Sequence, residues 1–397
     1  MPIFHRIADL LMAAIAAVTG FLFTGQVPPR AVPVPETGPL TGYVNPFVGT
    51  GSFPWTSGMT NPAACAPFGA VRLGPDTCWP FGLNLTNVGT GGYWRGKSHI
   101  YGFSHTRISG AGAIDGGQWR VTPGLGNADP RKRLERPLLF AHAREAAVPG
   151  YYAVWLPEAA CLAQLTATEH TGVHRYTFES AKDAHLFVDA GSLLKGEAGK
   201  ASIKAVDEYT LEGSFDGRVF FYTRVDTPFE AAIDGWVADL NFGNRKSEPI
   251  TMHVGMSYVS IAGAKANLLA ESAGLDFDQV YQNTRGAWEN RLASVNITAG
   301  SNETKKIFYT AMYHAMIHPT SITDVTGEYM GFSGKQGAAA GWTYRGDLSL
   351  WDTFRTTHPL YCLIAPDIQK DSAKSLLAMA KLHGGFPRWP RTTFEGG

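Results

Sequence analysis

The amino-acid sequence predicts a multidomain β + α protein in which an antiparallel β-sandwich precedes a helical region. Between Leu138 and Met256, short runs rich in β-branched and aromatic residues recur with Gly, Asp and Asn between them. The absence of intervening helical patterns favours a sandwich over an alternating α/β fold. After about Ala264 the apolar residues recur at helical spacing instead. We therefore expect strands first and helices second.

The composition excludes several classes of protein. The 397 residues include 34 Lys and Arg and 34 Asp and Glu, so the formal net charge is zero. A neutral chain lacks a basic footprint, and we expect no nucleic-acid partner. Charged residues make up only 17% of the chain, aromatic residues 12%, and there are 45 glycines. This profile suits a β-rich fold with tight turns and does not suit disorder.

The N-terminus has the pattern of an export signal, which we assign to residues 1–25. His5 and Arg6 precede an apolar run from Leu10 to Val18. A membrane anchor is the alternative, but the run is short against the roughly 20 residues that span a bilayer. We therefore expect an exported protein, periplasmic or extracellular, with no stable membrane span after signal removal. The five prolines of residues 26–41 predict an extended, semi-rigid linker.

The four cysteines are Cys65, Cys78, Cys161 and Cys362. None has C-x-x-C spacing, so a zinc knuckle is not expected. In an exported protein Cys65 and Cys78 could form a disulfide, and a buried free thiol fits Cys65 equally well.

The sandwich domain is predicted to cover residues 42–264. Its first part, from Tyr43 to Asp129, is dense in Gly, Pro and aromatic residues, which indicates short strands and elaborate loops. Glycines around Tyr93 and Trp94 let the backbone turn sharply and present an aromatic ring. Later strands are predicted at 151–156, 161–168, 171–178, 185–190, 202–211, 218–225, 233–240 and 250–257.

Residues 265–300 are predicted to form a linker helix. Asp276 can cap a helix in which Phe277, Val280, Tyr281 and Trp288 share one face.

Two further helices are predicted after this linker. One starts near Ser301 and ends at Pro319. The other begins after Pro366 and stops at Gly384. For the first, the residues expected to face inward are Ile307, Phe308, Ala311, Met312, Ala315 and Met316.

The stretch from Gly346 to Pro359 predicts a short helix with two faces. Leu350, Trp351 and Phe354 fall on an apolar side, and Pro359 ends the helix. Ser349 or Asp347 is the expected N-cap.

The opposite side of this helix carries Asp352, Arg355 and Thr356 at i, i+3 and i+4. These residues fit either a surface ion pair or a rigid element whose polar side faces a ligand.

His314 and His318 are also four residues apart. This spacing fits a metal-binding pair, but no third ligand accompanies them in the sequence. A partly buried helix face is the favoured interpretation.

Five ordered motifs between about residues 42 and 390 resemble glycoside hydrolase family 92. They are Asn45-Pro46-Phe47-Val48-Gly49-Thr50, Pro67-Phe68-Gly69 with Pro75-Asp76, Gly102-Phe103-Ser104-His105-Thr106 with Ser109-Gly110, Ser349-Leu350-Trp351-Asp352-Thr353-Phe354-Arg355 with His358-Pro359, and Gly385-Phe386-Pro387-Arg388-Trp389-Pro390.

Family 92 comprises exported, calcium-dependent, inverting α-mannosidases, mostly from bacteria. The resemblance implies a β-sandwich packed on an (α/α)6 toroid, with residues 301–397 forming the first toroid helices. It also implies hydrolysis of α-linked mannosides, α-1,2-linked glycans included, at the domain interface.

The resemblance assigns substrate-binding residues one by one. Asp352 matches an aspartate that holds the mannose at the cleavage subsite, and Arg355 matches the arginine beside it. Trp94 falls where the family places an aromatic ring against the next sugar, and loop packing is the alternative. His105 and Thr106 could bond a sugar hydroxyl or a loop carbonyl.

Gly49 is a further candidate in the first motif. We expect it to serve backbone geometry first and close approach of the substrate second.

The chain also departs from the family pattern. Inversion needs two carboxyl groups about 6.5–9.5 Å apart, and Asp352 with Asp347 is the only close pair. The resemblance places the general acid, the base and most calcium ligands beyond Gly397, so no catalytic or metal residue is assigned here. We therefore expect this chain alone to be inactive. The alternatives are a non-catalytic carbohydrate-binding protein and an inactive gene fragment.

Overall fold

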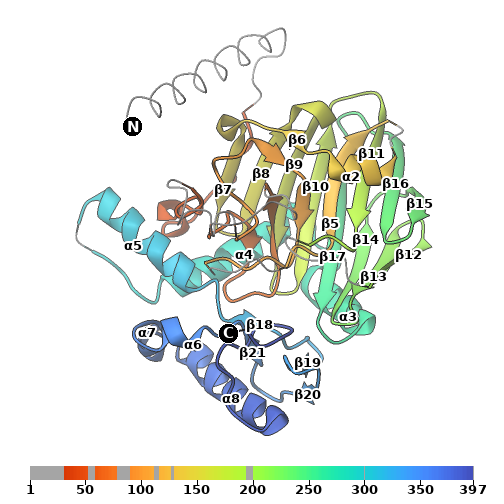
Figure 1. Ribbon diagram of the computed structural model, residues 1–397. Coiled ribbons are helices and arrows are strands. Elements are labelled where there is room, and N and C mark those ends of the chain that lie inside the picture. Colours follow the sequence, from red (N-terminus) through yellow and green to blue (C-terminus); the bar gives the residue numbers. More distant parts are fainter. Residues whose placement is uncertain are drawn as a thin grey trace, which may run out of the picture.

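The computed structural model describes residues 31–51, 59–77, 90–110, 116–126, 129–193, 200–298 and 300–396. Two large sheets form the first part of the molecule, and helices form most of the second part (Figure 1). The predicted signal peptide lies outside the described residues, and so does Cys78. Among the residues that the structure describes, we find no helix that is both long and apolar enough to cross a bilayer.

Both large sheets are antiparallel, as the sequence predicts. The first sheet contains, in spatial order, β1 (Ala64–Cys65), β2 (Arg72–Asp76), β4 (Gly102–Ser104), β5 (Arg120–Leu125), β11 (Asp183–Asp189), β16 (Val237–Asn244) and β15 (Glu230–Asp234). The second contains β12 (Ala201–Asp207), β13 (Thr210–Phe215), β14 (Val219–Val225), β17 (Pro249–Ser257), β10 (Thr171–Phe178), β9 (Cys161–Ala167), β8 (Tyr151–Leu156) and β7 (Glu145–Val148).

Smaller elements complete the strand-rich part and the loops. The short strand pairs are β3 (His99–Ile100) with β6 (Leu138–Leu139), β18 (Thr320–Ser321) with β21 (Arg345–Gly346), and β19 (Glu328–Met330) with β20 (Gln336–Ala338). The short helices are α2 (Pro130–Glu135) and the 3-10 turns η1 (Thr41–Tyr43), η2 (His142–Arg144) and η3 (Pro157–Ala159).

Each of two segments predicted as a single strand forms a hairpin of two strands in the structure. The predicted strand 202–211 divides between β12 and β13, and 233–240 divides between β15 and β16. The chain reverses at Glu208-Tyr209 and at Gly235-Trp236, where the strand-like composition continues through the turn. Composition alone therefore does not mark these hairpins.

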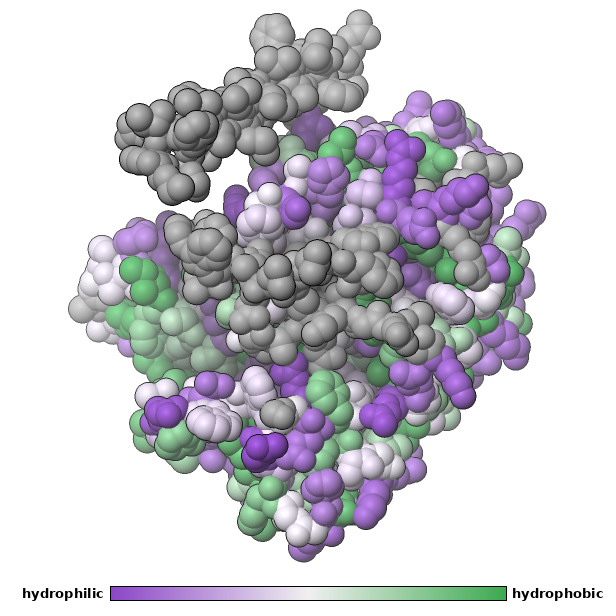
Figure 2. Space-filling view, in the orientation of Figure 1, coloured by the Kyte–Doolittle hydropathy of each residue, from purple (hydrophilic) through white to green (hydrophobic). Residues whose placement is uncertain are grey.

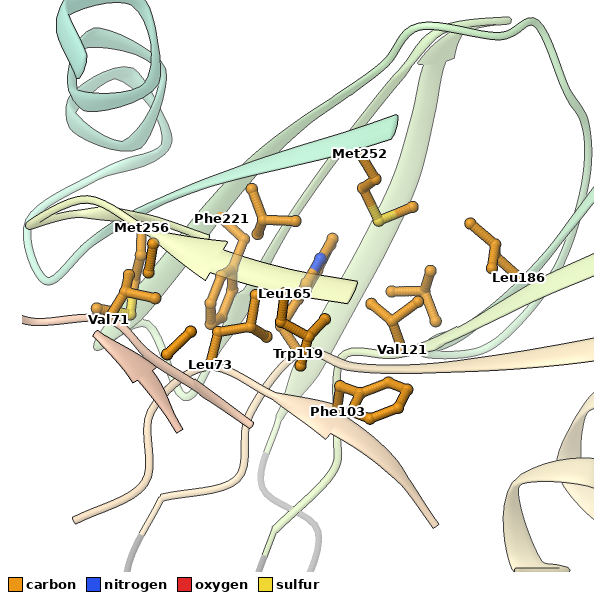
Figure 3. Close-up of a cluster of buried hydrophobic side chains, with 14 of the residues drawn as sticks. Val71, Leu73, Phe103, Trp119, Val121, Leu165, Leu186, Phe221, Met252 and Met256 are labelled. Carbon is orange, nitrogen blue, oxygen red and sulfur yellow. The ribbon is translucent and has the colours of Figure 1, made fainter. Parts of the chain in front are cut away.

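The core lies between the two sheets (Figure 3). Trp119 of the first sheet's loop stacks on Phe221 of β14, with ring centroids 4.8 Å apart and planes 18° apart. Gly213 makes room for this pair, because a Cβ there would lie 2.6 Å from the Trp119 ring. Such aromatic pairs add about 0.5–1.5 kcal/mol beyond area burial.

Two imidazoles form a hydrogen-bonded pair within this core. Tyr176 Oη lies 2.9 Å from His174 Nδ1, and His174 Nε2 lies 3.0 Å from His105 Nε2. His105 Nδ1 is 2.8 Å from the Trp119 carbonyl oxygen, so that nitrogen donates. Burial lowers the pKa of His105 to about 3 and takes the pKa of His174 well below its ordinary value. Both rings are therefore neutral at pH 7.

Cys65 is a buried free thiol, which is one of the two states the sequence allows. Its Sγ is 3.7 Å from Tyr313 Oη, and burial raises the pKa of the thiol to about 11.

Two helices follow the sandwich, in place of the one predicted across residues 265–300. Helix α3 (Ile261–Ser272) packs on β17, and Gly274 separates it from α4 (Phe277–Leu292). Asp276 and Gln279 form a capping box at the start of α4. The predicted face of α4 is buried, including Trp288.

The described part of the predicted linker, from residue 31, is extended and packs against the folded domain. Pro33 O accepts a hydrogen bond from Tyr151, and Glu36 O accepts one from Tyr281. The Glu289 carboxylate of α4 accepts from the backbone nitrogens of Leu40 and Thr41 and from the Thr41 hydroxyl. The segment is therefore fastened to α4.

Helix α5 (Asn302–Ala315) begins after Ser301, where the sequence places its start, and Met312 and Met316 of its predicted inner face are buried. Ile307 is 67% exposed and Ala311 is also exposed, so the prediction is wrong for these two residues. Tyr309 and Tyr313 occupy the inner face instead, because their rings fill the space beside Trp288 and η1. Figure 2 shows hydrophobic surface over α5.

The stretch predicted as one helix after Gly346 forms two. These are α6 (Leu350–Thr353) and α7 (Thr357–Ile364), and Pro359 lies in the first turn of α7 instead of ending a helix. Trp351 is 69% exposed and Phe354 58% exposed, so much of the apolar side of the predicted helix lies at the surface. Helix α8 (Pro366–His383) ends as predicted, at Gly384 with φ of 87°.

The neutral histidine pair makes stability depend on pH. The unfolded chain takes up protons near pH 6.5 and the folded pKa of His105 is about 3, so stability is complete above pH 6.5 and falls as the pH drops below it. We expect a loss of about 1.4 kcal/mol per pH unit for each histidine. Urea unfolding from pH 7 to pH 4 measures this slope. A His105→Gln/His174→Gln variant should have a shallower slope, and equal slopes would contradict the assignment.

Candidate functional site

A cavity of about 510 Å³ lies where a loop of the strand-rich module meets the helical region. Ile108, Ser109 and Gly110 line it from the first module. The helical region contributes His314, Ala315, His318, Pro319, Asp347, Leu348, Ser349, Asp352, Thr353, Thr357, His358, Tyr361, Trp389 and Arg391.

A buried ion pair joins the two parts of the molecule beside this cavity. Arg72 Nη2 of β2 lies 3.5 Å from Asp347 Oδ2, and the two side chains are 2% and 3% exposed. The Arg72 guanidinium also donates to the carbonyl oxygens of Arg107 (2.6 Å) and Gly69 (2.9 Å) and to Thr320 Oγ1 (3.1 Å). It therefore connects the strand module to β18.

The Asp347 carboxylate has a complete set of donors. It accepts from Thr320 Oγ1 at 2.5 Å, from Thr392 N at 3.1 Å and from Thr392 Oγ1 at 2.9 Å. Burial opposes ionisation of Asp347, but the charges of Arg72 and its neighbours keep its pKa below the ordinary value. Asp347 also has φ of 54°, a strained conformation that these bonds hold in place. The predicted helix cap is therefore a buried structural anion.

Asp352 lines the cavity, as the ligand-facing interpretation requires. It is exposed, and its Oδ2 accepts a hydrogen bond from Ser349 Oγ within α6. Arg355 does not lie in the described wall of the cavity. Its Nη1 donates to Trp351 O at 2.6 Å and its guanidinium lies 4.5 Å from the Phe354 ring. The described contacts do not pair Arg355 with Asp352, which corrects the surface ion pair.

Trp94 and Gly49 also lie outside the described cavity wall. Trp94 is half-buried, its N–H donates to Thr77 Oγ1 at 2.7 Å, and Lys97 Nζ lies 5.7 Å from its ring. Gly49 has φ of 80° in an exposed turn against Thr60. The structure thus shows local contacts for both residues and does not place them in the described wall.

His105 and Thr106 are structural, which corrects their assignment to substrate. His105 has no exposed surface and bonds Trp119 and His174 in the core. The Thr106 hydroxyl donates to Gln118 Oε1 and accepts from the backbone nitrogens of Gly117 and Gln118 at 3.0 Å. Both residues therefore hold the loops of the first sheet.

Three histidines of the cavity were not assigned to it from the sequence. His314 and His318 line the same wall, but α5 ends at Ala315, so the pair does not share a helix face. Burial lowers the pKa of His314 to about 4 and that of His318 to about 3, so both are neutral at pH 7. His358 joins them from α7. In the sequence, His358 stands in the fourth family motif, whereas only their i, i+4 spacing marked His314 and His318.

The described residues do not fit a calcium centre. No group of three or more His, Cys, Asp or Glu side chains that could hold a metal occurs in the part of the chain that the structure describes. Calcium takes six to eight oxygen ligands, and the cavity wall offers imidazoles and a single open carboxylate. The residues that the structure describes therefore support no chemical step through calcium.

Models of known protein families match almost the whole chain. Residues 43–257 match the model of the glycosyl hydrolase family 92 N-terminal domain, and residues 263–397 match that of the family 92 catalytic domain. The chain belongs to glycoside hydrolase family 92. The cavity of this family 92 chain therefore lies between its two domains, with Ile108–Gly110 from the first and the remaining wall from the second.

Solved structures of family 92 support the same fold. An α-mannosidase from Bacteroides thetaiotaomicron in complex with mannoimidazole is 28% identical with a TM-score of 0.80, covering 90% of this chain and 50% of that chain. A family 92 glycosyl hydrolase is 26% identical with a TM-score of 0.75, covering 89% and 52%. An inverting mannosidase from Bacteroides thetaiotaomicron VPI-5482, at 23% identity and a TM-score of 0.78 over 92% and 51%, shows the fold alone.

The family resemblance and the order of β-sandwich and α/α toroid helices are thereby confirmed. The chain spans about half the length of these solved relatives. No curated protein matches it.

The interdomain ion pair predicts a large effect of one substitution. Asp347→Asn leaves the buried Arg72 charge unpaired, so we expect the free energy of unfolding to fall by about 3–5 kcal/mol. The control is Asp278→Asn, because Asp278 is 70% exposed and its pair with Arg175 contributes about 0–1 kcal/mol. Urea unfolding of both variants measures the difference. Equal losses would contradict a stabilising role for the buried pair.

Proposed function

We propose that this chain forms the sugar-binding part of an α-mannosidase and that the interdomain cavity holds the terminal mannose of an α-linked mannoside. The observation that carries the proposal is the position of Asp352 in a cavity formed by both family 92 domains. The likeness to an α-mannosidase solved with mannoimidazole supports the same sugar. A preference for α-1,2 linkages and inversion of the anomeric centre belong to the proposal through family membership.

The chemistry of the cavity wall suits a neutral polyol. The Asp352 carboxylate can accept hydrogen bonds from two adjacent sugar hydroxyls, which is a charge-assisted contact. Tyr361 and Trp389 add ring surface to the same wall. His314 and His318 are neutral at pH 7, so they supply polar atoms without adding charge.

Hydrolysis with inversion needs an acid and a base on opposite sides of the scissile bond. The described wall contains two carboxylates, Asp347 and Asp352, and the Thr320, Thr392 and Arg72 contacts already engage Asp347. The described residues therefore support binding and orientation of the sugar. We assign the acid and the base to groups outside the described cavity wall. Non-catalytic carbohydrate binding is the second candidate, since one open carboxylate suffices for it.

Calorimetric titration of the 397-residue chain with mannoimidazole tests sugar binding. We expect binding that weakens about 10- to 100-fold in Asp352→Asn, because a hydrogen bond to a charged group is worth about 1.5–3 kcal/mol. Asp183→Asn is the matched control, because Asp183 is exposed on β11 in the other domain. Failure of the unsubstituted chain to bind, or equal affinities in both variants, would refute the proposal.

Hydrolysis of an aryl α-mannoside separates the two candidates. We expect no turnover by this chain alone, because its described cavity provides no acid–base pair. Turnover that Asp352→Asn abolishes would instead place a complete catalytic site within the chain.

A further inference from the structure

Buried nitrogen atoms without partners surround the interdomain cavity. The Nε2 atoms of His314, His318 and His358 are all buried and lack a hydrogen-bond partner among the described residues. These three imidazoles line the same cavity. Buried polar atoms in folded proteins almost always have a partner, and leaving one unpaired is costly. Three such atoms around one cavity indicate that its occupant supplies partners.

His358 is the member of this set whose proton is located by a side-chain contact. Its Nδ1 lies 2.7 Å from Gln369 Oε1 of α8. An amide oxygen only accepts, so in the neutral ring the proton is on Nδ1 and the lone pair is at Nε2. His318 is held instead by the backbone of Ser109 and a longer contact of 3.4 Å between its Nδ1 and Thr320 Oγ1.

The His358 ring is also fixed on a second side. It packs edge-on against Tyr361 with ring centroids 6.0 Å apart. The Tyr361 hydroxyl in turn donates to the backbone oxygens of Ala315 and His318, the latter at 2.8 Å. His358 is thus held between α8 and the end of α5.

The two acceptors of the wall stand close together in the chain. Asp352 lies in α6 and His358 in the first turn of α7, and both line the cavity. Asp352 and a δ-protonated His358 both accept hydrogen bonds from a ligand in the cavity, and neither donates one to it. A ligand that satisfies both brings at least two hydrogen-bond donors, as a sugar with several hydroxyls does.

We propose that His358 is a ligand-binding residue of this cavity, whose Nε2 accepts a hydrogen bond from a hydroxyl of the bound mannoside. Gln369 is its positioning residue, because its side-chain oxygen holds the imidazole in the required tautomer. The identity of the ligand rests on the proposed function, whereas the acceptor role follows from the contacts of the ring.

Titration of the full chain with mannoimidazole and with methyl α-mannoside tests the acceptor role. His358→Phe keeps a ring but removes the acceptor, and we expect about 5- to 100-fold weaker binding of methyl α-mannoside. Gln369→Glu keeps an oxygen acceptor opposite Nδ1, so at a pH where the imidazole is neutral it should bind almost as the unsubstituted chain does. Gln369→Met removes that acceptor and should bind several-fold more weakly. His383→Phe, at the exposed end of α8, is the matched control and should not change affinity.

Two further measurements distinguish direct contact between His358 and the ligand from a purely structural role of the ring. Nitrogen NMR of His358 should show an unprotonated Nε2 in the free chain, with a shift on adding methyl α-mannoside. Monodeoxy mannosides, each lacking one hydroxyl, complete a double-mutant cycle with His358→Phe. For the sugar that lacks the hydroxyl bonded to His358, the substitution should cause no further loss of affinity.

The outcomes distinguish the inference from the function beneath it. Binding that Asp352→Asn weakens and His358→Phe leaves unchanged would overturn the acceptor role and preserve the proposed function. A protonated Nε2 in the free chain would also overturn the acceptor role. No binding of either mannoside by the unsubstituted chain would overturn both.

Discussion

The architecture of the cavity depends on the buried pair between Arg72 and Asp347. Arg72 belongs to a strand of the first sheet, whereas Asp347 immediately precedes the segment that carries Asp352. With both side chains almost fully buried, neither charge has water as an alternative partner. The pair therefore fixes the catalytic-domain segment against the sandwich, and the space between them becomes the cavity. The strained backbone at Asp347 is maintained by the same contacts.

Much of the fold follows from local patterns. Period-two strands and their turns predicted β8 and β10 with the bounds that the structure has. Asp276 is the predicted helix cap, and α5 starts beside Ser301 as predicted. The failures occur where tertiary packing decides. Trp351 and Phe354 are apolar at helical spacing, yet the chain breaks into α6 and α7 and leaves both exposed. On α5, Tyr309 and Tyr313 are buried beside Met312 while Ile307 is exposed, because the tyrosine rings fit the space, which amphipathic spacing does not encode.

The site was less accessible from the sequence than the fold. Asp352 could be assigned because a family motif carries it, and it does line the cavity. His105 lies in an equally distinctive motif, but a glycine-rich loop motif does not reveal whether its side chain faces a ligand or a core. His358 required coordinates, since only the contact with Gln369 shows which of its nitrogens is available. Residues 108–110 share the wall with Trp389 and Arg391 only after folding.

The fastening of the N-terminal segment to Glu289 has a consequence for the order of events during biosynthesis. Thr41 and its carboxylate partner are 248 residues apart in the chain. A ribosome delivers residues 31–41 first, yet their partner on α4 emerges only after the whole sandwich has been translated. The N-terminal segment 31–41 therefore reaches its folded position only after the sandwich strands have been made, although it is the first described part of the chain to be translated.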